Sequence, residues 1–453
     1  MTAPTSLSGI SLPVTPLSGW GRYPVVDCRQ VRPGDPDGAT HATDAEPTLI
    51  ARGNGRSYGD ASLNPDATLV TSALDRFIDF DATTGWLTCE AGVLLTDIID
   101  AMLPRGWFPM VTPGTRFVSV GGMIASDVHG KNHHRDGSFC HHIDWFDLAL
   151  GDGRVLRCSR NDHADLFAAT CGGMGLTGVV LRARIRLRAV ETAAIRQRTL
   201  RADHLEHAME LFEATLDWTY SVAWIDCLAT GARTGRSVLL LGEHATCDEL
   251  DTARSTRPLA RTRPRARRLP VTPPAFVLGR TSMRLFNAAY YAAQREGEKL
   301  VDLDPYFYPL DAILDWNRIY GAGGFVQYQC VLPLAESARG IGRLLAAIAT
   351  VGDASFLAVL KRMGPSSPGL IGFPMAGYTL ALDFPASPVN LALLDRLDAI
   401  TVDHGGRVYL AKDARMVPAI IQGHPGLPMF REVRRRYGLD TRFSSLLSQR
   451  LGL

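Results

Sequence analysis

The hydrophobic pattern of the first third of the chain alternates short β-rich runs with one amphipathic segment. Residues 78–81 (IDFD) and 86–90 (WLTCE) are β-rich and are joined by a Thr-Thr-Gly turn, which predicts a β-hairpin. Residues 93–106 place leucine, isoleucine and methionine side chains at helical spacing and end in a proline and a glycine, which predicts a helix. An Asp-Gly turn inside residues 145–159 predicts a second hairpin.

The pattern changes near residue 190, where glycines become sparse and longer amphipathic segments begin. Segments such as 204–218 and 389–406 have the spacing of helices, and between them lie short strand-like runs such as 324–333. Helices that alternate with antiparallel-looking strands indicate an open sheet covered on one face. The tail after residue 405 is too short to form a domain and is expected to pack on one already built.

Length and composition describe an ordinary globular protein. The 453 residues exceed the usual size of one domain, so two folded units are expected. No run of eighteen apolar residues occurs and the N-terminus lacks the features of a signal peptide, so a cytoplasmic location is expected. The eight cysteines form no CxxC pair, which predicts reduced, mostly buried thiols rather than a zinc site or a disulfide framework.

One segment departs from the balanced charge of the chain. The net charge of +2 gives no reason to expect a nucleic-acid partner. Residues 254–268, however, contain seven arginines and no acidic residue, interrupted by two prolines, which predicts a mobile, solvated loop. No aromatic residues are interleaved with these arginines, so binding to single-stranded nucleic acid is not expected either.

The stretch 119–134 (SVGGMIASDVHGKNHH) combines backbone freedom with ionisable side chains, and three interpretations compete for it. His129, His133 and His134, with the histidines at 141 and 142, would form a metal site only if they converged, and the glycines make a regular helix there unfavourable. They are alternatively ordinary half-buried histidines. In the third interpretation the backbone lines an extended cofactor, with His129 and Lys131 as donors.

A second glycine-rich stretch, 51–60 (ARGNGRSYGD), favours the third interpretation, because two such loops look like two walls of one diphosphate-bearing cofactor. The GxGxxG pattern at 173–178 is misleading. A nicotinamide-binding loop follows a strand and opens a helix, whereas these glycines follow a helix-like run and lead into a strand-like one. A tight turn that allows close backbone approach is the alternative.

Several motifs occur in order along almost the whole chain: GWGR at 19–22, ARGNGRSYGD, TPGTRFVSVGG at 112–122, SDVHGKNHH at 126–134, CGGMGLTGVV at 171–180, WNRIYGAGGFVQYQ at 316–329 and GGRVYLAKDAR at 405–415. Together they resemble the FAD-binding oxidoreductases of the vanillyl-alcohol-oxidase fold, and within it the decaprenylphosphoryl-ribose 2′-oxidases. The resemblance implies an α+β protein with a two-part FAD-binding domain, residues 1–190 and 406–453. Residues 191–405 would form a substrate-binding cap, an antiparallel sheet covered by helices.

The resemblance also implies the residues of the site. No metal ligand is expected. Cofactor-binding residues would be Arg52, Gly53, Asn54, Gly55, Arg56, Ser57, Tyr58, Gly114, Ser119, Gly121, Gly122, Ser126, Asp127, His129, Val179 and Tyr409. Substrate-binding residues would be Tyr58, Gln327, Gln329, Lys361 and Lys412, and catalytic residues Lys412 and His129. Gln327 and Gln329 alternate with Tyr328 on a predicted strand, so both side chains lie on the same side of it. That side faces either a sugar, which both amides could hydrogen-bond, or solvent.

Two positions depart from the family pattern. Where many relatives carry the histidine that links covalently to FAD, this sequence has Arg56, so non-covalent FAD is expected. Ala381 stands where mycobacterial members carry a cysteine on the substrate side of the flavin, and Thr379 and Met363 also differ from residues common there.

The implied activity is FAD-dependent oxidation of the C2 hydroxyl of a polyprenyl-phosphate-linked pentose. The keto product would be reduced by a separate short-chain reductase, which completes an epimerisation. Lys412 would stabilise negative charge at the flavin or bind the substrate hydroxyl, and His129 has the ordinary pKa of a general base. The alternative is an alditol or aldonolactone oxidase acting on a free sugar. A membrane-anchored substrate would also give the arginines of 254–268 a role in peripheral membrane contact.

Overall fold

The computed structural model describes residues 14–262, 267–268, 279–351 and 358–453, which form an α+β protein. Both predicted hairpins are confirmed. β5 (Phe77–Asp81) pairs with β6 (Trp86–Glu90), and β8 (Ile143–Ala149) pairs with β9 (Val155–Ser159), each pair antiparallel. The predicted helix is α2 (Leu95–Met102), which buries its apolar face and is followed by a turn ending at Gly106 with φ +80°.

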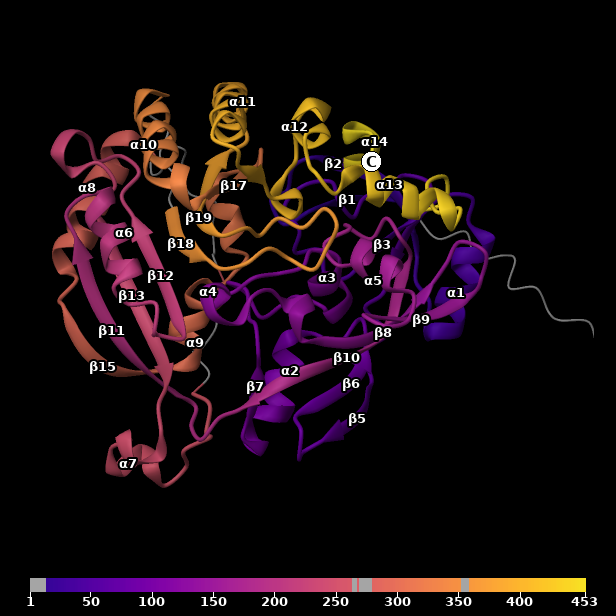
Figure 1. The fold of residues 1–453 in the computed structure, drawn as a ribbon, viewed down its shortest axis with the longest axis horizontal. Coiled ribbons are helices and arrows are strands. Elements are labelled where there is room, and N and C mark those ends of the chain that lie inside the picture. The colour runs from indigo at the N-terminus through magenta and orange to yellow at the C-terminus, as the bar shows by residue number, and fades with distance from the viewer. Residues whose placement is uncertain (1–13, 263–266, 269–278, 352–357) are drawn as a thin grey trace, which may run out of the picture.

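Two sheets build one half of the molecule (Figure 1). The first has the strand order β1 (Val14–Ser18), β2 (Val25–Val31), β4 (Thr68–Val70), β3 (Ile50–Arg52). The second has the order β5-β6-β10-β8-β9, and β10 (Val179–Ala189) also pairs with β7 (Trp107–Pro109). β10 is thus shared by three partner strands at the centre of this half.

An eight-stranded antiparallel sheet builds the other half. Its order is β15 (Gly297–Asp302), β11 (Ala194–Ala202), β13 (Ser237–His244), β12 (Tyr220–Ile225), β18 (Ala358–Met363), β19 (Gly377–Pro385), β17 (Phe325–Pro333), β20 (Arg407–Val408). Three helices, α6 (Leu205–Glu213), α10 (Leu334–Val351) and α11 (Pro388–Asp403), pack on one face of it (Figure 1). The opposite face is therefore left to line an internal space.

The C-terminal segment connects the two halves. It begins as β20 in the eight-stranded sheet and continues through α12 (Pro418–Gln422), α13 (Leu427–Arg436) and α14 (Leu446–Leu451). Backbone hydrogen bonds then join it to the first half, since the N–H of Leu49 donates to the carbonyl of Arg442 (2.9 Å) and that of Ser444 donates to the carbonyl of Leu49 (3.0 Å).

The structure explains the misleading glycine pattern. Its glycines follow α5 (Ala164–Thr170) and precede β10, the reverse of a nicotinamide-binding loop. A Cβ on Gly173 would lie 2.0 Å from the carbonyl oxygen of Ala169, and Gly178 has φ +144°. The pattern is therefore a tight turn that requires glycine, as the alternative interpretation held.

The expectation of a mobile loop at 254–268 is wrong for part of the segment. Helix α7 (Thr252–Ser255) begins it, and the side chain of Arg261 is only 9% exposed. Its guanidinium pairs with Asp304 at 2.7 Å and also with Asp100. Tertiary ion pairs thus fix this arginine, while residues 263–266 of the arginine-rich segment lie outside the described residues.

Two further expectations can be compared with the structure. Seven of the eight cysteines are buried and only Cys247 is exposed, as predicted. Within the part of the chain that the structure describes, no helix combines the length and apolarity that crossing a bilayer requires. The N-terminal residues 1–13, on which part of the targeting prediction rests, lie outside that part.

Candidate functional site

A cavity of about 540 Å³ lies where the two glycine-rich loops face the open side of the eight-stranded sheet. This volume is within the range of small-molecule and cofactor sites. The loop of residues 53–58 forms one wall, residues 112–122 and 125–131 form another, and strands β12, β17 and β18 close the far side. The prediction that the two glycine-rich stretches border one space is therefore confirmed.

Glycine allows the two loops to approach each other closely. A Cβ on Gly53 would lie 2.1 Å from the Oγ of Ser119, and one on Gly121 would lie 3.1 Å from the Cβ of Ala91. The loops are also tied by the side-chain amide of Asn54, which donates to the carbonyl of Phe117 at 2.8 Å. The backbone of both walls is thus open to a ligand that a larger side chain would exclude.

Most of the predicted site residues line this cavity: Gly53, Asn54, Gly55, Arg56, Ser57, Tyr58, Gly114, Ser119, Gly121, Gly122, Ser126, His129, Gln327, Gln329, Lys361, Tyr409 and Lys412. Three of them, Arg52, Asp127 and Val179, do not. Gln327 and Gln329 are 8% and 3% exposed, so the alternative of a solvated sheet face is wrong.

The three predicted residues outside the lining make structural contacts. The guanidinium of Arg52 donates to the carbonyl of Ser18 at 2.7 Å, which holds the end of β1. Asp127 is fully buried and accepts hydrogen bonds from the backbone N–H of Cys140 and the hydroxyl of Ser138. Side chains alternate along β10, so Val180 reaches the cavity, whereas Val179 does not line it.

The histidines of the 119–134 stretch are held by separate partners. His133 accepts from the backbone N–H of Gly364 at 2.9 Å, and the Nε2 of His134 lies 2.9 Å from the carbonyl of Trp218. Among the described residues, no group of three histidine, cysteine or carboxylate side chains is placed to hold a metal ion. Of these three histidines, only His129 lines the cavity.

His129 is neutral in this environment. Burial holds its pKa well below the ordinary value, and nearby Lys361 adds to the effect. The amide of Gln329 donates to its Nε2 at 2.9 Å, which leaves the proton on Nδ1, a buried atom without a hydrogen-bond partner. The position of His129 fits the prediction, but a ring with so low a pKa binds a proton weakly and is a poor general base.

Three half-buried lysines project into the cavity. Burial lowers the pKa of Lys131 to about 7 and that of Lys361 to about 8. The ammonium of Lys131 donates to the carbonyl of Tyr306, and within the described chain no carboxylate lies in ion-pair distance of Lys131 or Lys361. In their protonated forms Lys131 and Lys361 therefore present positive charge to whatever fills the cavity, and Lys131 exchanges its proton near neutral pH.

Lys412 lies at the floor of the cavity. Its ammonium is 3.9 Å from the ring centre of Tyr58. Burial lowers its pKa and the nearby Asp383 opposes that change, while burial raises the pKa of Asp383. Asp383 also accepts a hydrogen bond from the side-chain amide of Gln327. Gln327, Asp383 and Lys412 therefore form one buried polar network.

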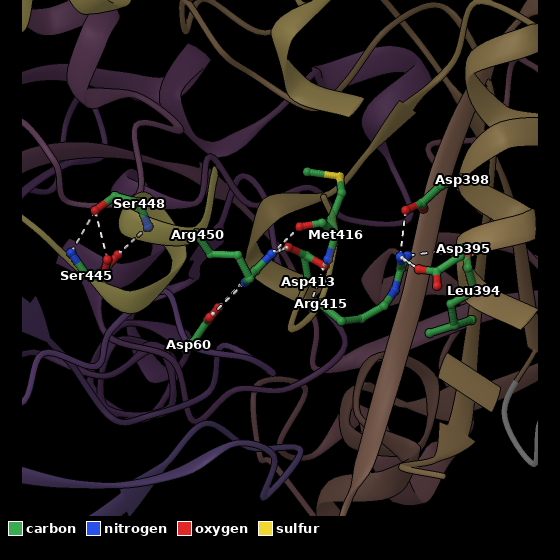
Figure 2. A network of polar contacts seen from close by, with 10 residues as sticks. All are labelled: Asp60, Leu394, Asp395, Asp398, Asp413, Arg415, Met416, Ser445, Ser448 and Arg450. Atoms are coloured by element: carbon green, nitrogen blue, oxygen red, sulfur yellow. Dashed lines mark hydrogen bonds and ion pairs between the residues drawn. The ribbon is translucent and has the colours of Figure 1, made fainter. Parts of the chain in front are cut away.

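Ion pairs of Arg450 join Asp413, the chain neighbour of Lys412, to Asp60 beside the first glycine loop (Figure 2). The guanidinium bridges Asp60 at 2.8 Å and Asp413 at 2.9 Å, and both carboxylates are nearly fully buried. Backbone contacts follow the same path, since the N–H of Tyr58 donates to the carbonyl of Ala411 at 3.0 Å. The segment that carries Lys412 is thus fixed on both sides.

Sequence reasoning missed part of the lining. Aromatic and apolar side chains at one end of the cavity come from β12, β13 and α8 (Arg280–Ala293), segments without a recognisable motif. These residues include Val222, Trp224, Leu240 and Tyr290. Met174, Gly175 and Gly178 belong to the glycine pattern discussed above, Thr170 ends the helix before it, and Val180 lies in the strand after it; none of them was among the predicted site residues.

Comparison with known proteins identifies relatives over the full length. Residues 39–159 match a family model described as an FAD binding domain. Over 448 residues the chain is 33% identical to the decaprenylphosphoryl-beta-D-ribose oxidase of Mycolicibacterium smegmatis, an alignment that covers 96% of this chain and 97% of that relative. It is 38% identical over 376 residues to the "uncharacterized protein in mprA 5'region" of Streptomyces coelicolor, covering 80% of this chain and 100% of that protein. Similarity to cytokinin dehydrogenase 3 of Arabidopsis thaliana, 29% over 157 residues, covers only 34% of this chain and 29% of that enzyme.

The residues of the cavity fit FAD. Among the residues that the structure describes, its lining contains four lysines and arginines, Arg56, Lys131, Lys361 and Lys412, and one acidic residue, Asp311. A diphosphate and an electron-rich ring system are ligands that such an excess of cations attracts. The buried Nδ1 of His129 and the Nε of Arg56 have no hydrogen-bond partner and are free to donate to a ligand.

Arg450→Met is expected to destabilise the protein strongly, because it leaves the carboxylates of Asp60 and Asp413 buried without a cation. Breaking a buried ion pair in this way costs roughly 3–5 kcal/mol. The free energy of unfolding, measured by chemical denaturation, tests the expectation. Arg435→Met is the matched control, since Arg435 is 63% exposed and its pair with Glu432 lies on the surface. The control should lose less than about 1 kcal/mol. Equal losses in both variants would show that the Arg450 bridge has no special role.

Proposed function

The chain belongs to the family of FAD-binding oxidoreductases that includes decaprenylphosphoryl-beta-D-ribose oxidase, and on this basis we propose that it oxidises the C2 hydroxyl of a polyprenyl-phosphate-linked pentose to a keto sugar. It is an FAD-dependent oxidoreductase. The proposed division of labour assigns FAD to residues 1–190 and 406–453 and the substrate to residues 191–405. A separate short-chain reductase would then convert the keto sugar into the epimer.

The observation that carries the proposal is the combination of polar and apolar linings in one cavity. Near the glycine loops lie amide and ammonium groups, of Gln327, Gln329 and Lys361, which can bind sugar hydroxyls and a phosphate. Farther along, the rings of Trp224 and Tyr290 lie 4.7 Å apart and form an apolar region. A sugar phosphate attached to a hydrocarbon chain requires both regions, whereas a free polyol requires only the first.

The side chains of the cavity suggest how the reaction is supported. When bound, FAD supplies the acceptor of the hydride that leaves the C2 carbon. Lys412, held between Tyr58 and Asp383, would supply positive charge to stabilise the negative charge that develops on the acceptor. Because burial brings the pKa of Lys131 to about 7, this group can exchange a proton near neutral pH. Lys131 is in this respect a better candidate than His129 for accepting the hydroxyl proton.

A free-sugar oxidase, acting on an alditol or an aldonolactone, is the second candidate. The polar half of the cavity suits a free sugar as well as a lipid-linked one. A free sugar, however, has no hydrocarbon chain to contact the apolar region around Trp224 and Tyr290. Ala381, which lines the cavity between these two parts of the lining, does not discriminate, because hydride transfer needs no thiol there.

Anaerobic bleaching of the flavin distinguishes the two substrate classes. We expect lipid-phosphate pentoses to bleach it and free polyols to fail; bleaching by free polyols alone would contradict the proposed substrate.

Lys361→Met should raise KM for the phosphate-bearing substrate about tenfold or more, since a hydrogen bond to a charged group contributes roughly 1.5–3 kcal/mol. Lys299→Met, an exposed lysine on β15, is the control. In the wild type, KM should rise as pH increases through about 8, because Lys361 then loses its positive charge.

We further propose that FAD is bound without a covalent link. Arg56 occupies the position of the linking histidine, and its guanidinium lies 4.1 Å from the ring centre of Trp20. Acid precipitation should therefore release the yellow cofactor into the supernatant. Flavin absorbance that remains in the washed pellet would contradict this proposal.

A cytoplasmic protein with peripheral membrane contact remains part of the proposal. Arg261 is excluded from such contact by its buried ion pairs, but Arg257, Arg267 and Arg268 are exposed. Each basic residue near an anionic membrane contributes about 1 kcal/mol. Replacing these three arginines by glutamine should reduce co-sedimentation with phosphatidylserine vesicles at least tenfold. A triple replacement of Arg339, Arg343 and Arg396, exposed arginines of α10 and α11, is the control, and equal binding of both triple variants would refute membrane contact here.

A further inference from the structure

A second cavity, of about 330 Å³, lies directly beside the first. It is bordered by residues 371–375, by β20 and by α12, and residues at its rim, including Val402 and Pro425, are exposed. Its floor is buried and apolar, with Ile371, Met416 and Ile421 exposed by 6% or less. The second cavity is therefore an opening from the surface, between the ends of α11 and α12, toward the cofactor site.

The wall between the two cavities is one residue thick. Ser126, Met174 and Tyr409 line both of them. The ring of Tyr409 stacks on Phe373 with centres 4.6 Å apart, and its hydroxyl donates to the carbonyl of Ser126 at 2.7 Å. The ring of His129, which lines the first cavity, contacts both of these rings, with its centre 5.3 Å from that of Tyr409 and 5.4 Å from that of Phe373. The wall is thus a compact cluster of three aromatic rings, so a flat ring in the second cavity would lie within a few side chains of the first cavity.

One cation in the second cavity has no counter-ion. Arg407 is half-buried and uses one guanidinium nitrogen to donate to the carbonyl of Gly372 at 3.0 Å. No carboxylate of the described residues pairs with it. His424 faces the same carbonyl, but burial lowers its pKa to about 4, so it is neutral and adds no charge. The remaining N–H groups of Arg407 are available to an oxygen of a ligand.

The shape and chemistry of this space select a class of ligand. Apolar side chains, among them Met375, Leu410 and Ile420, suit a flat hydrocarbon ring, while Arg407 suits a carbonyl oxygen that becomes negative on reduction. Molecular oxygen would need neither the volume nor the cation. A flavoenzyme must also be reoxidised in every turnover, and an acceptor that enters here would not compete with the sugar in the first cavity.

We propose that the second cavity binds an electron acceptor of the quinone class, with Arg407 donating a hydrogen bond to a quinone carbonyl. The quinone takes up two electrons and two protons from the reduced cofactor and leaves through the open rim as a hydroquinone, and the cofactor is thereby returned to its oxidised form. The inference rests on the FAD-dependent function of the first cavity and not on the identity of the sugar.

Stopped-flow reoxidation of the holoenzyme tests this assignment. The flavin is reduced anaerobically with dithionite, so that no sugar is needed, and is then mixed with menadione. We expect Arg407→Gln to lower the rate constant of reoxidation by menadione about tenfold or more, as the loss of a charge-assisted hydrogen bond predicts. Ile420→Trp, a replacement at the half-buried rim, should have a similar effect by filling the space. Reoxidation by oxygen should change less than twofold in both variants.

Controls separate the cavity from the cofactor site. Arg396→Gln, at an exposed position on α11 outside the cavity lining, should behave as the wild type. Titration calorimetry of the oxidised holoenzyme should show menadione binding that both cavity variants weaken and the sugar substrate does not displace. Unchanged reoxidation by menadione in both variants, or displacement of menadione by the sugar, would overturn the proposal. Failure of the sugar to bleach the flavin would count against the proposed substrate and leave this result intact.

Discussion

The bridge formed by Arg450 is the interaction on which the geometry of the site depends. A single guanidinium near the end of the chain joins Asp60, 390 positions earlier, to Asp413, the neighbour of Lys412. Local sequence preferences cannot bring such distant segments together, and two buried carboxylates repel each other unless a cation lies between them. Gly59 tightens the junction, since a Cβ there would lie 1.9 Å from the carbonyl oxygen of Asp413. The position of Lys412 relative to the first glycine loop consequently depends on Arg450 in the C-terminal helix α14.

The charges inside the two cavities are arranged for ligands and not for the stability of the empty protein. Burying an ammonium without a partner is unfavourable, which is why the pKa values of Lys131 and Lys361 are lowered. An anionic cofactor supplies the missing charge, so its binding contributes to the stability of the folded state. Arg407 in the second cavity is likewise a cation without a carboxylate partner among the described residues, and the proposed ligand would offer it a carbonyl oxygen.

Sequence alone predicted the parts of the site that depend on local rules. The glycine loops were recognisable from composition and motif, and Gln327 and Gln329 were placed on one face by strand alternation, which the structure confirms. Val179, a predicted cofactor-binding residue, does not line the cavity, whereas its neighbour Val180 does, because side chains alternate along β10. The prediction of a mobile loop was wrong at Arg261, because its partner Asp304 lies 43 positions away and only the fold brings the two together.

Ala381 has a consequence for chemical inhibition. In the described part of the chain no cysteine lines the large cavity, and the thiol of Cys330, on the strand that pairs with that of Ala381, is buried with its pKa raised to about 12. An electrophilic drug that depends on a covalent bond to a thiol beside the flavin would meet a methyl group here. Such compounds could act on this protein only through reversible contacts.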